Sequence, residues 1–371
     1  MPKPLADNEV LRTALAEACP ELTGELRPLV DSGLAHDHYR IEDSPWLLRV
    51  PKQSQRGYAA ADNLAYQAAC FERVSASGHG PKLRVSLPPG RGLPMGALVV
   101  EYIEGRPPRL PQDLPALAEA MAAVHALPLP SAAQRPPLED HLDPVAGALE
   151  EIETQARYLD GPEVSPETRS QLREELDWAR AYAADVDGPP QPRSLVLTDT
   201  HPGNFLIRAK TGTEASPRAR MDGARNGRAV IVDLEKALYG APAIDLAHAT
   251  VYSSTTWDVA TSAVLSLREI ADFYRRYLDA IGSTRSAIIA PTLLPLRRLL
   301  LLRALTWCAL WRVEHRAEIS EGVEAGWAAA RSNPTLIAHV EDRTRHYLDP
   351  AVVRRLRGEW LDSPGLESLF R

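Results

Sequence analysis

The sequence predicts an α+β fold, with strands concentrated in the N-terminal part of the chain and helices in the C-terminal part. Three strand-like stretches separated by turn residues, 25–30, 38–42 and 46–50, predict a small antiparallel meander. From residue 250 onward, apolar residues recur at helical spacing. Two short apolar runs, 195–197 and 230–232, predict buried strands, because β-branched and leucine residues follow one another there without a helical period.

Other elements follow in order along the chain. A short amphipathic helix over residues 8–18, capped by Asp7 or Asn8, ends before Pro20. The helix patterns that follow are rich in alanine or in alternating Glu and Arg, and one further strand lies between them. We expect helices at 56–77 and 114–127, a strand at 97–103, two or three helices within 131–190, and C-terminal helices at 258–281, 293–316, 321–330 and 334–346.

Length and composition describe an ordinary globular protein. The 371 residues suffice for two domains or lobes, and 44% hydrophobic with 25% charged residues is typical of that class. A net charge of −7 argues against a nucleic-acid partner, which requires a concentrated basic face. The three cysteines are far apart and lack C-x-x-C spacing, so we expect reduced thiols and no disulfide or zinc site.

The chain carries no obvious targeting or spanning segment. Its first ten residues contain no apolar signal core. The most hydrophobic run, 293–302, is interrupted by Pro295, Arg297 and Arg298, so it is too short and too charged to span a bilayer. We therefore expect a cytoplasmic protein without a membrane partner.

Each of the two buried apolar runs leads into an aspartate, Asp199 after the first and Asp233 after the second. Pro202 and Gly203 predict a turn between them, and Asn204 stands five positions after Asp199. Phosphoryl transfer needs these residue types, because a carboxylate orients and deprotonates the attacking hydroxyl while an amide and a second carboxylate hold magnesium on the phosphates. The alternative is that the two aspartates and the asparagine are ordinary turn residues with no catalytic role.

The stretch 199–204, Asp-Thr-His-Pro-Gly-Asn, resembles the D-x-H-P-G-N motif of the aminoglycoside phosphotransferase and choline kinase superfamily. The segments 232–235, Val-Asp-Leu-Glu, and 243–247, Ala-Ile-Asp-Leu-Ala, are similar to the family's I-D-[WFL]-E and D-[LV]-A elements. The family usually begins its catalytic loop with H-G-D, where this chain has Leu197-Thr198-Asp199.

The resemblance implies a protein-kinase-like two-lobe fold, with a small antiparallel β-sheet lobe and a larger, mainly helical lobe. We expect a nucleotide-binding lobe over residues 1–104 and a catalytic and acceptor-binding lobe over 105–371. It further implies ATP or GTP with Mg²⁺ as cofactors, Asp199 as catalytic base, and Asn204 and Asp233 as metal ligands. Asp245 is assigned a supporting role that braces the catalytic loop.

The N-terminal part supplies candidate nucleotide contacts. Residues 33–41, beginning at Gly33, resemble the family's phosphate loop, although Ala35-His36 replaces Ser-Asn and a plain hairpin turn is the alternative. Arg49 occupies the place of the strand cation that grips the phosphates in kinases, and Lys52, its rival, falls on the opposite strand face. Asp62, with Glu72 second, is the candidate acid that pairs with Arg49, and surface acids without such a partner are the alternative. Glu101, Tyr102 and Ile103 resemble the family's hinge beside the adenine.

The acceptor side is less defined. Glu235 is expected near a second metal or the acceptor. Trp307 and Trp311 are four residues apart and share a helical face, with Glu314 beyond them. These aromatics form a box for a cationic acceptor or, as helical stripes mostly do, pack in the core. His125 fits a core histidine, and the excursion 208–228 is a lid or a disordered tip.

The sequence thus predicts an ATP- or GTP-dependent kinase that phosphorylates a hydroxyl of a small molecule, such as an aminoglycoside, an amino-alcohol or a sugar. The alternative is a catalytically impaired kinase-like protein that binds a nucleotide or a partner, suggested by Ala35-His36 and Leu197. A protein kinase is disfavoured, because Glu235 stands where the D-F-G glycine would be and no A-P-E segment follows.

Overall fold

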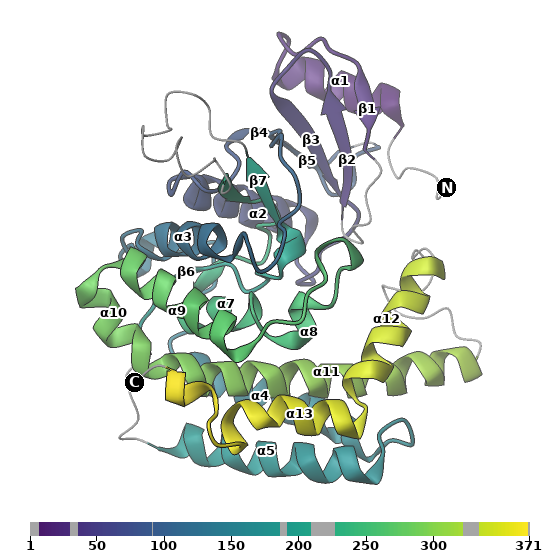
Figure 1. Cartoon of the computed structure of the whole chain (residues 1–371). Helices are drawn as coiled ribbons and strands as arrows, with labels where there is room; N and C mark the ends of the chain where they lie inside the picture. The colour runs from purple at the N-terminus through teal and green to yellow at the C-terminus, as the bar shows by residue number, and fades with distance from the viewer. Residues whose placement is uncertain are drawn as a thin grey trace.

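The computed structural model describes residues 7–29, 36–90, 92–185, 191–208, 227–321 and 334–369. In the N-terminal part, five antiparallel strands form a sheet in the order β1-β2-β3-β5-β4 (Figure 1). Their bounds are Leu26–Pro28 (β1), His36–Ile41 (β2), Trp46–Pro51 (β3), Leu83–Leu87 (β4) and Ala97–Glu101 (β5). The predicted meander is confirmed. Strand β4 was not predicted, although Leu83, Val85 and Leu87 alternate with polar residues as a half-buried strand requires.

The first helix covers one face of this sheet. Helix α1, Asn8–Ala18, buries Leu11 and Leu15, and the Asp7 carboxylate caps it by accepting the Glu9 N–H. The α1 leucines pack against Tyr39, Ile41, Leu48 and Val50 of β2 and β3. Because side chains alternate across a strand, Arg49 lies on the opposite face, toward the rest of the molecule.

The second face of the sheet joins the main core. Helix α2, Ala60–Ser75, packs Cys70 and Phe71 into the same core as Leu98 and Val100 of β5. It begins four residues later than the helix predicted at 56–77. The polar side chains that α2 buries are Asn63 and Gln67, which stand one turn apart and therefore share a face.

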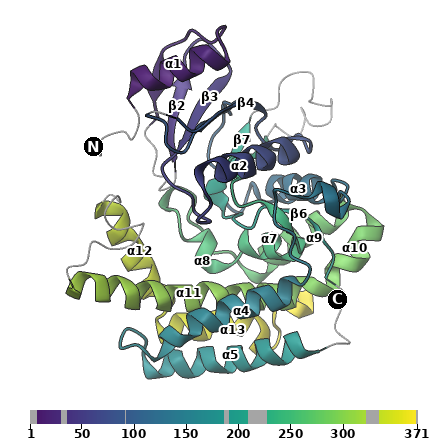
Figure 2. The ribbon, with the colours of Figure 1, turned by 180° about the vertical axis from the view of Figure 1, so that it is seen from behind.

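The remaining chain is mainly helical (Figures 1 and 2). The long helix α11 crosses the molecule beneath α7, α8 and α9 (Figure 2). Helices α4, α5 and α13 pack on the side of α11 that is opposite to α7, α8 and α9 (Figure 2). None of the helices in the described residues is long and apolar enough to cross a bilayer. The helices are α3 Leu114–His125, α4 Pro144–Ala156, α5 Pro166–Ala184, α7 Pro242–His248, α8 Tyr252–Thr255, α9 Leu267–Ile281, α10 Ser283–Ile289, α11 Leu293–Glu321, α12 Pro334–Tyr347 and α13 Pro350–Leu361.

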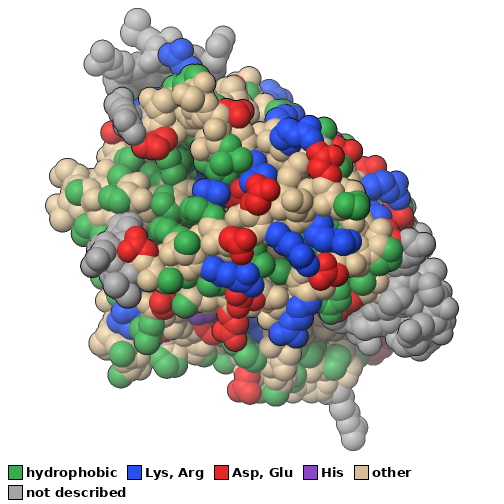
Figure 3. Space-filling view, turned by 90° about the horizontal axis from the view of Figure 1, so that it is seen from below, with side chains coloured by type: hydrophobic (Ala, Val, Ile, Leu, Met, Phe, Trp, Pro, Cys, Tyr) green, Lys and Arg blue, Asp and Glu red, His purple; other side chains and the backbone are tan. Residues whose placement is uncertain are grey.

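The face seen from below mixes basic and acidic side chains rather than separating them (Figure 3). Among the described residues, Arg354 of α13 pairs with Glu167 of α5, and Arg180 pairs with Glu153, all four exposed.

Several predicted boundaries change. The helix predicted from residue 258 begins at Leu267, because Ser266 and Glu269 form a capping box there. Helix α12 confirms the prediction at 334–346, and α13, capped by Asp349, was missed. The helix predicted at 321–330 and the excursion at 208–228 lie almost wholly outside the described residues.

Two short strand pairs lie between the sheet and the helices. Strand β6, Ser194–Val196, pairs with β9, Leu238–Gly240, and β7, Phe205–Arg208, pairs with β8, Arg228–Ile231. The two predicted apolar runs are therefore confirmed as strands. The Val232 N–H donates to the Asn204 carbonyl over 3.0 Å. This contact brings the segment after β8 against the turn before β7, and both predicted aspartates emerge there.

Candidate active site

The turn that follows β6 is held by a buried carboxylate. Asp245 of α7 accepts the backbone N–H groups of Leu197 and Thr198, each over 2.7 Å. Its own carbonyl accepts the Thr200 hydroxyl over 2.7 Å. His125 of α3 contacts the Asp245 carboxylate over 3.1 Å, and both side chains are fully buried. Two helices, α7 directly and α3 through Asp245, thus fix the backbone on either side of Asp199.

This arrangement accounts for two sequence predictions. Asp245 braces the loop as expected, and His125 is a core histidine whose second nitrogen lies 3.0 Å from the Tyr277 hydroxyl. Leu197, in the position where the family motif has histidine, is buried in the main core. The brace therefore comes from α3 and α7 and needs no histidine at position 197.

The Asp199 carboxylate stands among three cationic or ionisable side chains. Its Oδ2 accepts from Lys236 Nζ over 2.5 Å. Its Oδ1 lies 4.0 Å from His201 Nε2 and 3.9 Å from His248 Nδ1. Burial acts to raise the pKa of Asp199, but Lys236, His248 and His201 outweigh it and lower the pKa below its ordinary value. Asp199 is therefore held ionised, as a proton acceptor must be.

Asn204 and Asp233 lie beside this carboxylate. The Asn204 side-chain N–H donates to the Asp199 carbonyl over 2.8 Å, which leaves the amide oxygen for another partner. Asp233 follows β8, and its side chain is 35% exposed. Burial acts to raise the pKa of Asp233, but the Arg49 guanidinium outweighs it and the net shift is strongly downward.

The donor set of this site fits a magnesium ion. It offers one carboxylate and one amide oxygen, both hard ligands. Within the described ranges, no cluster of three or more His, Cys, Asp or Glu side chains is arranged to hold a metal unaided. A site of this kind suits Mg²⁺, which takes one or two protein ligands and completes its shell with phosphates and water.

Arg49 is buried between the sheet and the segment after β8. Its guanidinium contacts Asp233 Oδ1 over 2.5 Å and also donates to Glu235. It lies 3.1 Å from His36 Nδ1, whose other ring nitrogen is 3.2 Å from the Gln67 side chain of α2. A strand cation thus meets the two carboxylates of the Asp-Leu-Glu segment.

This placement changes two expectations. Asp62 and Glu72, the acids of α2 considered as partners of Arg49, are both exposed, and the structure does not bring them to it. Glu235 is 5% exposed and lies against Arg49 and Asp233, so of its two predicted places it stands on the side of Asp233. Burial and the neighbouring Asp233 carboxylate raise the pKa of Glu235 well above its ordinary value.

A family model described as the phosphotransferase enzyme family matches residues 27–286, well over half of the chain. The chain belongs to this family. The match runs from β1 to α10 and therefore includes the sheet, Arg49, the Asp199 turn and the Asp-Leu-Glu segment. Membership supports transfer of a phosphoryl group to a small molecule. No match is found among curated protein sequences.

Solved structures of similar fold are kinases and phosphotransferases of small molecules. A choline/ethanolamine kinase family protein from Mesorhizobium loti is 18% identical, with 98% of each chain covered and a TM-score of 0.56. Choline kinase from Cryptosporidium parvum is 15% identical, with 98% of this chain and 100% of that chain covered and a TM-score of 0.53. Aminoglycoside 2'-phosphotransferase-IIIa, in complex with GDP, is 13% identical, with 92% and 99% covered and a TM-score of 0.58. These likenesses confirm the protein-kinase-like fold.

In this phosphotransferase, the predicted hinge follows β5 and leads out of the sheet. The Tyr102 N–H donates to the Pro45 carbonyl over 2.8 Å, and Ile103 is buried. Glu101 pairs with Arg208 of β7 over 2.9 Å. These contacts fix residues 101–103 between the sheet and strand β7. Gly33, the predicted phosphate-loop glycine, lies outside the described residues.

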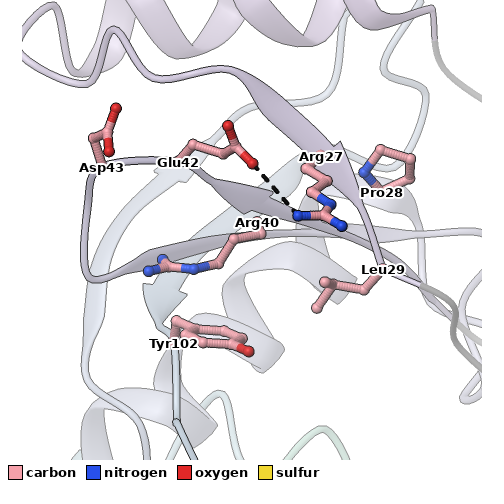
Figure 4. A pocket seen from close by; sticks show the side chains of 7 residues that line it. All are labelled: Arg27, Pro28, Leu29, Arg40, Glu42, Asp43 and Tyr102. Atoms are coloured by element: carbon pink, nitrogen blue, oxygen red, sulfur yellow. Dashed lines mark ion pairs between the residues drawn. The ribbon is translucent and has the colours of Figure 1, made fainter.

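The hinge also borders a pocket of about 570 Å³ (Figure 4). The Arg40 guanidinium lies 4.1 Å from the centre of the Tyr102 ring, and Arg27 reaches to 3.8 Å from Glu42. Arg40 is opposite Leu47 in the sheet, and Leu47 and Arg49 are two residues apart on β3. The pocket therefore opens on the same face of the sheet as Arg49.

The predicted acceptor residues separate into two groups. Trp307 of α11 is 37% exposed, and its ring meets that of Trp257 edge to face at 6.1 Å. The next residue, Asp258, reaches the catalytic turn, because a Cβ on Gly203 would lie 2.8 Å from its carboxylate. Glu314, in contrast, is exposed and accepts the Tyr158 hydroxyl over 2.7 Å. Trp311 is half-buried between them on α11.

Four residues of the site were not among the predicted ones: His201, Lys236, His248 and Asp258. His201 lies inside the Asp-Thr-His-Pro-Gly-Asn motif, and Lys236 and His248 directly follow the two other motif segments. Their positions next to the motifs were a usable signal. Asp258 offered no such signal, because it falls in a segment whose pattern predicted a helix.

Proposed function

We propose that this protein transfers the γ-phosphoryl group of ATP or GTP, as a magnesium complex, to a hydroxyl group of a small molecule. The observation that carries the proposal is the convergence of Asp199, Asn204 and Asp233 at the ends of β6, β7 and β8. One oxygen of Asp199 is engaged by Lys236, and the other accepts no hydrogen bond from the described residues. That second oxygen is available to an acceptor hydroxyl.

Each residue then has a role that its contacts support. Asp199 accepts the hydrogen bond of the acceptor hydroxyl and takes its proton as the oxygen attacks the phosphorus in line. Asn204 and Asp233 would hold the metal, which when bound would neutralise charge on the phosphate oxygens. Arg49 turns from Asp233 to the phosphates, for which its planar fork is suited. Catalysis of this type depends on positioning and electrostatics.

The nucleotide would lie along the face of the sheet that carries Arg40 and Arg49. Its base would sit beside the hinge, 101–103, next to the pocket of Figure 4. Its phosphates would reach Arg49 and the metal ligands. The GDP complex of the aminoglycoside phosphotransferase supports nucleotide use in this fold.

The acceptor would enter from the side of His201, His248 and Asp258, with Trp257 and Trp307 beyond. These residues offer hydrogen-bond partners, one carboxylate and aromatic surface, which suits a hydroxylated molecule such as an amino-alcohol, an aminoglycoside or a sugar. The similarity to choline kinases and to an aminoglycoside phosphotransferase supports the same range.

The test is a coupled assay of nucleotide turnover with Mg²⁺ against a panel of aminoglycosides, choline, ethanolamine and hexoses. Nucleotide binding is measured alongside by calorimetry, with and without a chelator. We expect acceptor-dependent turnover, a loss on the order of 10³-fold in Asp199→Asn with nucleotide affinity kept, and loss of the magnesium effect on affinity in Asp233→Asn. Turnover at the wild-type rate in Asp199→Asn would refute the assignment of Asp199 as the catalytic base. Nucleotide binding without turnover on any acceptor would favour the impaired, kinase-like binding protein.

A further inference from the structure

The segment after β8 carries a cation next to the catalytic carboxylate. Lys236 Nζ lies 2.5 Å from Asp199 Oδ2, and the side chain of Lys236 is 39% exposed. Burial acts to lower the pKa of Lys236, but Asp199, Glu235 and Asp233 outweigh it and raise the pKa. The Lys236 amine is therefore protonated, and the nearby carboxylates of Glu235 and Asp233 also stabilise its charge.

The backbone of Lys236 is fixed from two other elements. Its carbonyl accepts the Thr198 hydroxyl over 3.0 Å and the Arg56 guanidinium over 3.0 Å. Arg56 is itself paired with Glu139 over 2.6 Å and lies 4.8 Å from the centre of the Tyr66 ring. The ammonium group thus extends from an anchored backbone, unlike that of a lysine on a free surface loop.

Thr198 makes this anchor at a conformational cost. Its φ of +60° lies in the left-handed region, which β-branched residues rarely adopt and which glycine adopts freely. A glycine at position 198 would remove the strain, but it would also remove the hydroxyl that holds Lys236. Strained residues of this kind persist where surrounding bonds over-determine them, and here Asp245 and the Lys236 carbonyl supply those bonds.

We propose that Lys236 is a positioning residue that fixes the Asp199 carboxylate through Oδ2 and so presents Oδ1 to the acceptor hydroxyl. Thr198 in turn fixes the position of Lys236. The inference rests on the proposed function, in which Asp199 is the base. Without the ammonium, the carboxylate is free to rotate and the hydroxyl loses its fixed acceptor. The consequence falls on the rate of transfer and not on nucleotide binding, which involves Arg49 and the metal ligands.

The first experiment compares Lys236→Met, Lys236→Arg and the wild type in kcat, in the KM of acceptor and nucleotide, and in nucleotide affinity by calorimetry. We expect Lys236→Met to lower kcat on the order of 10²-fold, because a misplaced catalytic group costs about that factor, while nucleotide affinity stays within about twofold. Lys236→Arg recovers part of the loss. Added alkylammonium ions partly restore kcat in Lys236→Ala.

The control is Lys82→Met at an exposed lysine. Unchanged kcat in Lys236→Met, or equal losses of kcat and nucleotide affinity, would overturn the proposal.

The second experiment tests the anchor. Thr198→Ser keeps the hydroxyl and should keep kcat, whereas Thr198→Val keeps the shape without it and should lower kcat on the order of tenfold. Thr198→Gly should raise the melting temperature and lower kcat together, which a purely structural role would not produce. Residues that act as one unit are not additive, so Thr198→Val added to Lys236→Met should cost little more. Full additivity would contradict the shared role.

A third measurement does not depend on turnover. The ion pair keeps the Lys236 amine protonated, so its acylation by an amine reagent, followed by mass spectrometry, should be slow in the wild type and several-fold faster in Asp199→Asn. If no acceptor is turned over, the proposed function fails, and the labelling still decides whether Lys236 holds Asp199. Equal labelling in both proteins would overturn the inference by itself.

Discussion

Arg49, on the third strand of the sheet, is paired with Glu235, which stands 186 residues further along the chain. Protein kinases pair their strand cation with a glutamate of the helix packed on the sheet. Here that helix, α2, contributes Gln67, which reaches Arg49 through His36. The carboxylate comes instead from the segment after β8, which also carries Asp233, the proposed metal ligand. The sheet and the segment after β8 are therefore joined by a buried contact between Arg49 and Glu235.

Removing Glu235 should weaken both the fold and the grip on nucleotide. In Glu235→Ala, Arg49 keeps Asp233 but loses its buried partner, and we expect the free energy of unfolding to fall by about 2–3 kcal/mol, somewhat less than for a buried charge left wholly unpaired. Glu235→Gln keeps the volume and one acceptor and should cost less. Nucleotide affinity should fall about tenfold in Glu235→Ala because Arg49 is less well placed. Denaturant unfolding and calorimetry measure the two effects.

The control for Glu235 is Asp62→Ala. Asp62 is exposed on α2, so this variant should change stability by no more than about 0.5 kcal/mol and leave nucleotide affinity unchanged. An effect of Asp62→Ala equal to that of Glu235→Ala would restore the helix acid as the partner of Arg49.

A second prediction concerns the buried brace. Asp245→Asn replaces a carboxylate oxygen that accepts a backbone N–H with an amide N–H, so one of the donors of Leu197 and Thr198 meets another donor. We expect a loss of about 3 kcal/mol in the free energy of unfolding, because a buried backbone N–H loses its charged acceptor and is left unsatisfied, together with a large loss of turnover.

The matched control for the brace is Asp349→Asn. Asp349 also accepts two backbone N–H groups, those of Ala351 and Val352, but it is exposed at the start of α13. Loss of an exposed cap costs about 1 kcal/mol, and Asn is itself a good cap, so the variant should cost less and leave turnover unchanged. Equal destabilisation by the two substitutions would mean that Asp245 acts only as a helix-terminal acceptor.

The sequence could predict the part of the site that depends on short-range order. Asp199 and Asn204 share one turn, and Asp233 follows the strand that pairs with the strand after Asn204, so residue type and the two apolar runs indicate one site. The sequence could also predict that Asp245 and His125 each have a polar partner, because a buried polar residue inside an apolar pattern must find one.

The long-range pairings could not be predicted in the same way. Which face α2 turns to the sheet depends on packing, and the structure turns Asn63 and Gln67 inward and Asp62 outward. The contact of Asp258 with the catalytic turn depends on where α9 begins, and a capping box moves that start to Leu267. The spacing of residues along the chain predicts neither the orientation of α2 nor the start of α9.

A third prediction follows from His248, whose Nδ1 is 3.9 Å from Oδ1 of Asp199, the proposed base. Burial lowers the pKa of His248 to about 4; Asp199 acts to raise it, and His201, Arg303 and Lys236 act to lower it. The unfolded chain binds this proton near the ordinary value of 6.5, so the unfolded state holds more protons between the two values. The contribution of His248 to stability is therefore fully present above pH 6.5 and is lost as the pH falls toward 4.

Urea unfolding between pH 4 and pH 7 measures this dependence, and His248→Gln should reduce its slope, while His36 and His79, whose pKa values burial also lowers, keep the remainder. A histidine NMR titration gives the pKa directly, and Asp199→Asn should move it lower still because a favourable charge is removed. A His248 ring that titrates near its ordinary value would contradict the buried, neutral histidine of the structure.

The last prediction separates the two groups of residues on α11. Trp307 meets Trp257, whose neighbour Asp258 touches the catalytic turn, whereas Glu314 is engaged by Tyr158 away from it. Trp307→Ala should raise the KM of the acceptor about tenfold, the usual scale for an aromatic contact with a ligand, and change kcat and the nucleotide KM little. Glu314→Gln keeps an acceptor for Tyr158 and should change none of these values. If Glu314→Gln instead raised the acceptor KM while Trp307→Ala did not, the acceptor would bind further along α11 than the contacts with the catalytic turn indicate.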